Sequence, residues 1–135
     1  MDVPFPVSSE AAFDYLVDPV HRPEWQSSLR RVEDVDGEPR VGQTWTDVTV
    51  PGLRPAMETT VLERPRRWSE RGTWRGVAAT LTLTFADAPG GCTVHADFAI
   101  TGRGPLGPAL RLLTVASRPA VRADLRRAAE ILGKR

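Results

Sequence analysis

The feature that most constrains the fold is a change of hydrophobic period along the chain. Between residues 28 and 101, apolar and polar side chains alternate with a period of two in six successive segments, and turn-forming residues separate them. Because the connections are short, we expect consecutive segments to pair as an antiparallel meander. Leu81, Leu83 and Phe85 alternate with threonines, so one face of the sheet is predicted to be buried and the other solvated. The expected strands are Leu29–Val35, Thr44–Val50, Ala56–Glu63, Trp68–Trp74, Ala79–Ala86 and Thr93–Thr101.

A single long amphipathic helix is predicted after the last of these strands. Apolar side chains recur there at spacings of three and four, which indicates a helix over residues 107–132 with one buried stripe. Such a helix is roughly 40 Å long and can cover the apolar face of the sheet. Pro119 removes a backbone hydrogen bond in its middle, so we expect a kink or a break there. The stripe consists of Leu106, Leu110, Leu113, Ser117, Val121, Leu125, Ala128 and Leu132.

The N-terminal segment completes an α+β pattern. Val3–Phe5 predicts a very short first strand. Ser8 is a suitable N-cap for a helix that ends at Asp18-Pro19, because proline disfavours the helical conformation of the residue before it. A second short helical turn is expected over His21–Trp25. The length of 135 residues then fits one domain, 1–135.

Composition excludes several classes of protein. One cysteine rules out a disulfide framework or a multi-cysteine zinc site, and we expect no metal and no cofactor. No apolar run is long enough for a membrane span, and the N-terminus lacks the blocks of a signal peptide, which favours a cytoplasmic protein. The net charge is +1, with 12 acidic and 5 basic residues in 1–63 against 5 acidic and 13 basic residues in 64–135. No basic run contains interleaved aromatic residues, so nucleic acid is not an expected partner.

Five short motifs occur in an order that matches a known superfamily. They are Phe13-Asp14-Tyr15-Leu16, Asp18-Pro19-x-x-x-Pro23-x-Trp25, Val41-Gly42-x-x-Trp45, Glu63-x-Pro65-x-x-Trp68 and Gly90-Gly91-Cys92-Thr93-Val94. With the terminal helix, they make the chain resemble the START/Bet v 1-like helix-grip superfamily (SRPBCC), and within it the bacterial polyketide cyclase/dehydrase-like proteins. The resemblance covers about residues 3–132. It implies a helix-grip fold, in which a curved antiparallel sheet of six to seven strands wraps around a long C-terminal helix, with two short helices after the first strand.

A sheet that closes around a helix leaves a cavity on its concave face, and such a cavity is the default binding site. Trp68 and Trp74 share one face of their strand. Because a strand seldom presents two tryptophan side chains to solvent together, we place that face inward. The glycine-rich segment from Gly102 to Pro108 is a candidate hinge at the mouth, with Arg103 at the rim. The expected ligand-binding residues are Trp25, Trp45, Met57, Thr59, Trp68, Trp74, Leu83, Phe98, Leu110 and Leu113.

Glu70 is the candidate catalytic residue. It shares the inward face with Trp68 and Trp74, and burial among apolar side chains would raise its pKa toward the range that a general acid or base needs. Two structural interpretations compete with this one. Glu70 could lie near a strand end, or it could form an ion pair with one of Arg66, Arg71, Arg75 or Arg111.

Three classes of function remain open from the sequence. The protein could bind a small hydrophobic or aromatic molecule, polyketide-like or lipid-like, between the sheet and the C-terminal helix. It could be a polyketide cyclase/dehydratase-type enzyme that uses acid–base groups in the same cavity. It could also be a protein-interaction module with a filled cavity, and a volume below roughly 150 Å³ would favour this last class because ligand pockets measure about 300–1,000 Å³. A monomer and a homodimer are both compatible with the sequence.

Overall fold

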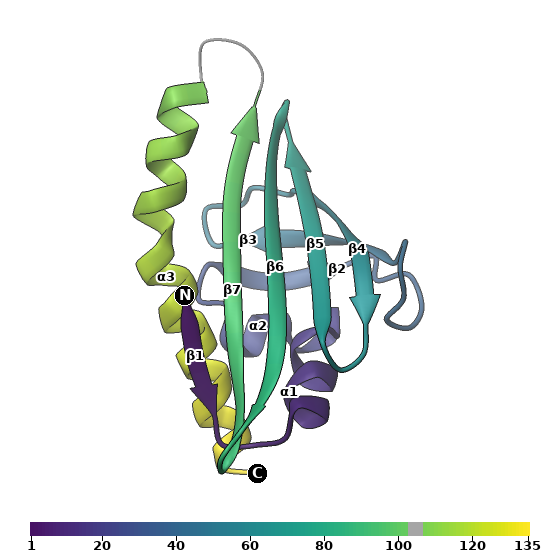
Figure 1. The fold of residues 1–135 in the computed structure, drawn as a ribbon. Coiled ribbons are helices and arrows are strands. Elements are labelled where there is room, and N and C mark those ends of the chain that lie inside the picture. Colours follow the sequence, from purple (N-terminus) through teal and green to yellow (C-terminus); the bar gives the residue numbers. More distant parts are fainter. Residues whose placement is uncertain (103–106) are drawn as a thin grey trace.

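The computed structural model describes residues 1–102 and 107–135, which form one curved antiparallel sheet with three α-helices and a 3₁₀ turn (Figure 1). The sheet order is β1-β7-β6-β5-β4-β3-β2, so β1 and β2 form its two edges. Leu106, Arg103 and the middle of the candidate hinge lie outside the described residues. The elements are β1 (Asp2–Phe5), α1 (Ser9–Leu16), η1 (Pro19–His21), α2 (Arg22–Trp25), β2 (Leu29–Glu33), β3 (Thr44–Thr49), β4 (Ala56–Glu63), β5 (Arg67–Trp74), β6 (Val77–Ala88), β7 (Gly91–Gly102) and α3 (Gly107–Gly133).

The strand predictions and the helix-grip fold are confirmed. The expected alternation holds on β6, where Leu81, Leu83 and Phe85 are buried while the threonines between them are half-buried or exposed. β6 and β7 are each longer than predicted, with 12 residues, and pair along their whole length. β2 and β3 run nearly crosswise to β6 and β7 (Figure 1), so the sheet is strongly curved and has a concave inner face.

The short helices begin and end where local chemistry predicts. The Ser8 hydroxyl accepts a hydrogen bond from the Ala11 amide (3.1 Å) and caps α1. After α1, the Asp18 carboxylate accepts a hydrogen bond from the Val20 amide (3.1 Å) and caps η1. α2 follows η1 directly, so the chain turns into the concave side of the sheet and buries Arg22 and Trp25 there.

The C-terminal helix α3 differs from the prediction at two points. It continues through Pro119, so the expected break is wrong. The carbonyl that proline deprives of a partner belongs to Val115, whose side chain is on the exposed side of the helix, where water can hydrate that oxygen. The second difference is that only the second half of the apolar stripe is deeply buried, through Leu125, Ala128 and Leu132. In the first half, Leu113 is 50% exposed.

The first half of α3 covers the edge of β7 instead of the concave face. β1 pairs with β7 only from Cys92 to His95, so the rest of that edge needs another partner. The Thr114 hydroxyl supplies one by accepting a hydrogen bond from the Ile100 amide (2.8 Å). In Figure 1, α3 accordingly runs alongside β7 and β1.

Candidate functional site

The concave face of the sheet holds a partly open cavity of about 260 Å³, called the inner cavity below. Its walls come from the region of α2 and from strands β2 to β7. Most of the lining is apolar, and its polar end is formed by side chains from α2, β3 and β5. The lining residues are Arg22, Gln26, Ser28, Leu29, Asp47, Thr49, Pro55, Met57, Glu70, Gly72, Thr73, Trp74, Val77, Ala79, Leu81 and Phe98.

A larger hollow of about 630 Å³ lies at the β7 edge of the sheet. Its lining includes Thr80 and Thr82, which project from the outer face of β6, as well as Arg118 on α3. It therefore belongs to the outer surface. The inner cavity is the better candidate site because charged side chains that are almost fully buried converge on it.

Three charged residues form the polar end of the inner cavity. Arg22 donates from Nη1 to Glu70 Oε2 (2.6 Å) and from Nη2 to Asp47 Oδ2 (2.9 Å). Its Nε also donates to Asp47 Oδ1 (3.2 Å). The exposed fractions of the three side chains are 2% for Arg22, 6% for Asp47 and 7% for Glu70. We call this set the buried charge cluster.

Local structure explains why these side chains meet. Arg22 and Trp25 lie three residues apart on α2, so both project from the same face of the helix onto the sheet. On β3, the alternation turns Trp45 and Asp47 to the same side, and Trp45 Nε1 donates to Asp47 Oδ1 (2.9 Å). The Arg22 guanidinium also lies over the Trp45 ring, 5.2 Å from its centroid.

Burial changes the protonation equilibria in the cluster. Burial raises the pKa of Glu70, an effect that Asp47 increases and that Arg22 opposes. Burial by itself would lower the pKa of Arg22, but the two carboxylates beside it raise that pKa above its ordinary value. Arg22 is therefore a permanent cation, and Glu70 holds its proton more tightly than a glutamate in water.

Four of the residues singled out from the sequence line the inner cavity: Met57, Glu70, Trp74 and Phe98. Trp74 lies at the rim and is 37% exposed, because it is the last residue of β5. The prediction that the Trp68 and Trp74 face of β5 is directed inward is confirmed, since Trp68 is fully buried and Trp74 lines the inner cavity.

The other expected ligand-binding residues are outside the lining. Trp25, Thr59, Trp68 and Leu83 are buried in the core, and Thr59 lies directly opposite Glu70 in the β4–β5 register. Among the described residues, Trp25 Nε1, Trp68 Nε1 and Thr59 Oγ1 have no hydrogen-bond partner. Trp45 contacts the buried charge cluster through Asp47 but lines a different hollow. Leu110 is half-buried near Gly102 and Leu113 is half-exposed, because α3 flanks the sheet instead of crossing the cavity.

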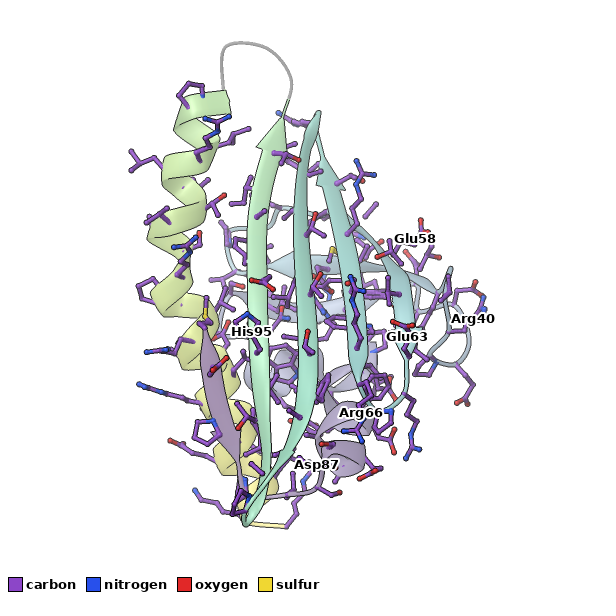
Figure 2. The ribbon with its side chains drawn as sticks, in the orientation of Figure 1. Arg40, Glu58, Glu63, Arg66, Asp87 and His95 are labelled. Carbon is purple, nitrogen blue, oxygen red and sulfur yellow. The ribbon has the colours of Figure 1, made fainter. Side chains whose placement is uncertain are left out.

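Sequence reasoning missed Arg22. An ion pair of Glu70 was among the structural interpretations, but its partner is none of the four arginines considered. Arg66, for example, lies on the outside of the molecule near Asp87, at 3.6 Å (Figure 2). The one available signal was the spacing of Arg22 to Trp25, which puts a charged residue on the helix face that carries the large buried aromatic residue.

Within residues 1–102 and 107–135, no group of three histidine, cysteine, aspartate or glutamate side chains is placed to hold a metal ion. None of the helices in the described part of the chain is long and apolar enough to cross a membrane.

The amino-acid sequence matches one known protein family over its whole length. Residues 1–135 match the family described as polyketide cyclase / dehydrase and lipid transport. The chain belongs to this family. No functionally curated protein matches this member of the family in sequence.

Solved structures show the same fold at low sequence identity. Protein MLL2253 from Mesorhizobium loti is 16% identical with a TM-score of 0.77, over 99% of this chain and 95% of that one. Ara h 8.0201 is 14% identical with a TM-score of 0.75, over 100% of this chain and 96% of that one. The di-domain ARO/CYC StfQ from the steffimycin biosynthetic pathway is 15% identical with a TM-score of 0.76, over 96% of this chain and 48% of that one. This chain therefore shares its fold with these solved proteins over nearly its whole length.

Proposed function

We propose that this protein binds a small hydrophobic or aromatic molecule, polyketide-like or lipid-like, in the inner cavity. The observation that carries the proposal is an apolar space that ends on a buried charge cluster. Its volume of about 260 Å³ lies just below the usual range for ligand pockets, about 300–1,000 Å³. The ligand is therefore expected to be compact.

The walls fit such a ligand. Leu81 and Phe98 supply apolar surface, and Met57 supplies an adaptable side chain that can adjust to the shape of a ring. The family description, which names both cyclase/dehydrase activity and lipid transport, supports a site that holds an apolar molecule away from water.

Native mass spectrometry of freshly purified protein tests the proposal. We expect a non-covalent adduct that disappears when the protein is denatured. Ala79→Leu fills part of the inner cavity and should abolish the adduct, because Ala79 is in its lining. Ala86→Leu is the matched control, since Ala86 is an exposed residue on the outer face of the same strand. An adduct that survives Ala79→Leu as well as Ala86→Leu would place the ligand elsewhere.

A second candidate function is acid–base catalysis of the cyclase/dehydratase type in the same cavity. It is favoured by Glu70, which lines the cavity and has its pKa raised by burial. The solved neighbours StfQ and BexL, both described as ARO/CYC proteins, also favour it. The test compares Glu70→Gln with the wild type on a poly-β-carbonyl substrate. Loss of turnover with retained substrate binding supports catalysis, and unchanged turnover removes Glu70 from any mechanism.

The third class, a protein-interaction module with a filled cavity, is less favoured. Its requirement was a volume below roughly 150 Å³, and the inner cavity exceeds that value at about 260 Å³. A protein that gives no adduct and binds none of the aromatic probes named below would restore this third class.

A further inference from the structure

The buried charge cluster carries unequal numbers of positive and negative groups. Among the described residues that line the inner cavity, Arg22 is the one basic residue, whereas Asp47 and Glu70 are both acidic. Arg22 and Asp47 are also the charged groups that shift the pKa of Glu70. With both carboxylates ionised, the polar end of the cavity therefore has one negative charge in excess.

The two carboxylates of the cluster also differ in how many hydrogen bonds they accept, and Asp47 accepts more than Glu70. Arg22 donates from Nε and Nη2 to Asp47, and from Nη1 and Nη2 to Glu70. Nη2 also donates to Gln26 Oε1 (3.2 Å). Asp47 Oδ1 accepts a second hydrogen bond, from Trp45 Nε1. Glu70 receives hydrogen bonds from Arg22 alone among the described residues, so its oxygens retain acceptor capacity.

We propose that the ligand of the inner cavity carries a protonated amine, which binds Glu70 while the apolar part of the ligand packs against Met57, Leu81 and Phe98. The inference rests on the proposed function and specifies the class of ligand. An ammonium group would balance the excess negative charge of the cluster and would donate to the unused lone pairs of Glu70. A buried charge is stable only when it is paired and hydrogen-bonded, and this ligand meets both conditions.

The same geometry disfavours anionic ligands such as fatty acids. A ligand carboxylate would put a third negative charge beside Asp47 and Glu70. Arg22 already pairs with both carboxylates and keeps one N–H of Nη1 without a protein acceptor among the described residues, so it can offer an anion a single hydrogen bond against two adjacent negative charges. In a site with an unpaired arginine, the guanidinium could bind the carboxylate of a ligand. Here Asp47 and Glu70 already neutralise the guanidinium of Arg22.

Amine binding should also depend on pH. An ammonium ion stabilises the ionised form of Glu70, whereas burial favours the protonated form in the empty site. The groups that face Glu70 are Arg22 from α2 and Asp47 from β3, with the hydroxyl of Thr59 opposite on β4. Affinity for the amine should therefore rise with pH as Glu70 loses its proton.

Three probes with one ring system separate these possibilities: 1-naphthylmethylamine, 1-naphthalenemethanol and 1-naphthaleneacetic acid. Isothermal titration calorimetry on the wild-type protein at pH 7 should show the amine binding about tenfold more tightly than the alcohol, and the acid most weakly. Glu70→Gln removes the excess charge and keeps the shape, so it should cost the amine about tenfold in affinity and leave the alcohol within about threefold. Asp47→Asn removes the same charge from the other carboxylate and should act in the same direction. Glu63→Gln is the control, because Glu63 is exposed at the end of β4 (Figure 2).

Each outcome has a distinct meaning. If the acid binds as tightly as the amine, or if Glu70→Gln and Asp47→Asn leave the preference for the amine intact, the inference is wrong while the binding function stands. If none of the three probes binds and no adduct is found by native mass spectrometry, the proposed function fails, and the inference fails with it.

Discussion

Replacing Arg22 by methionine tests whether Arg22 compensates for the buried negative charges of Asp47 and Glu70. Methionine keeps an unbranched apolar stem but lacks the guanidinium. The substitution removes the hydrogen bonds to Glu70 at 2.6 Å and to Asp47 at 2.9 Å. It leaves two carboxylates whose side chains are only 6% and 7% exposed without a cation.

The expected cost is large because the remaining charges cannot reach water. Removing one partner of a buried ion pair costs about 3–5 kcal/mol of folding free energy. Arg22→Met should lie at the upper end, about 5 kcal/mol, because one guanidinium serves two carboxylates that then repel each other. The loss should shrink at acidic pH, where protonation neutralises both carboxylates.

Urea denaturation followed by tryptophan fluorescence measures this cost. With a slope of about 2 kcal/mol per molar urea, the unfolding midpoint should fall by about 2.5 M at pH 7. The triple variant Arg22→Met, Asp47→Asn, Glu70→Gln is the matched control, because it has the same cavity shape and no formal charge in the cluster. It should recover most of the loss.

Two results would refute the reasoning. One is a loss below about 1 kcal/mol for Arg22→Met, which is the range of an exposed ion pair and would mean that water reaches the carboxylates. The other is a triple variant no more stable than Arg22→Met, which would assign the cost to lost packing instead of uncompensated charge.

Three further predictions concern stability. Because burial raises the pKa of Glu70 above its ordinary value of 4.5, the folded state binds this proton more tightly than the unfolded state, and the free energy of unfolding should fall as pH rises from 4.5 through the raised pKa. Urea titrations at several pH values should show this decline in the wild type and a smaller one in Glu70→Gln; equal declines would contradict it. Leu125→Ala removes a fully buried side chain of α3 and should cost about 2–5 kcal/mol, whereas Leu113→Ala on the half-exposed part should change stability by less than about 0.5 kcal/mol. Gly91→Ala puts a methyl group against the backbone carbonyl of Phe5, so it should disrupt the β1–β7 pairing and speed amide hydrogen exchange in β1, while unchanged exchange would contradict that account.

The order of elements could be predicted from the sequence because strands and helices have different hydrophobic periods. The Thr44 and Ala56–Glu63 boundaries agree with the structure, and so does the helix that ends before Asp18-Pro19. The lengths of β6 and β7 could not be predicted, because their ends are set by backbone pairing across the hairpin and not by side-chain polarity. Ala88 and Gly91, for example, pair with each other beyond the last apolar residue of either predicted strand.

The candidate site could be predicted only in part, for a related reason. Alternation on β5 and β4 correctly turns Glu70 and Met57 toward the cavity, because a strand offers only two directions. Extending the stripe of α3 to Leu113 failed, because periodicity identifies the apolar face of a helix but not how much of its length has something to pack against. Arg22 was missed because a charged residue in a short polar turn is normally solvated, and only the position of α2 on the sheet reverses that expectation.

The buried charge cluster links the position of α2 to the chemistry of the cavity. Arg22 joins α2 to β3 through Asp47 and to β5 through Glu70, so these ion pairs hold one wall of the inner cavity against the other. One carboxylate would suffice to balance Arg22, and a second buried carboxylate costs folding free energy. Stability alone therefore does not account for Glu70, which faces the cavity with acceptor capacity to spare. A cation that enters the cavity would compensate for that charge, and it would strengthen the cluster that positions the wall beside it.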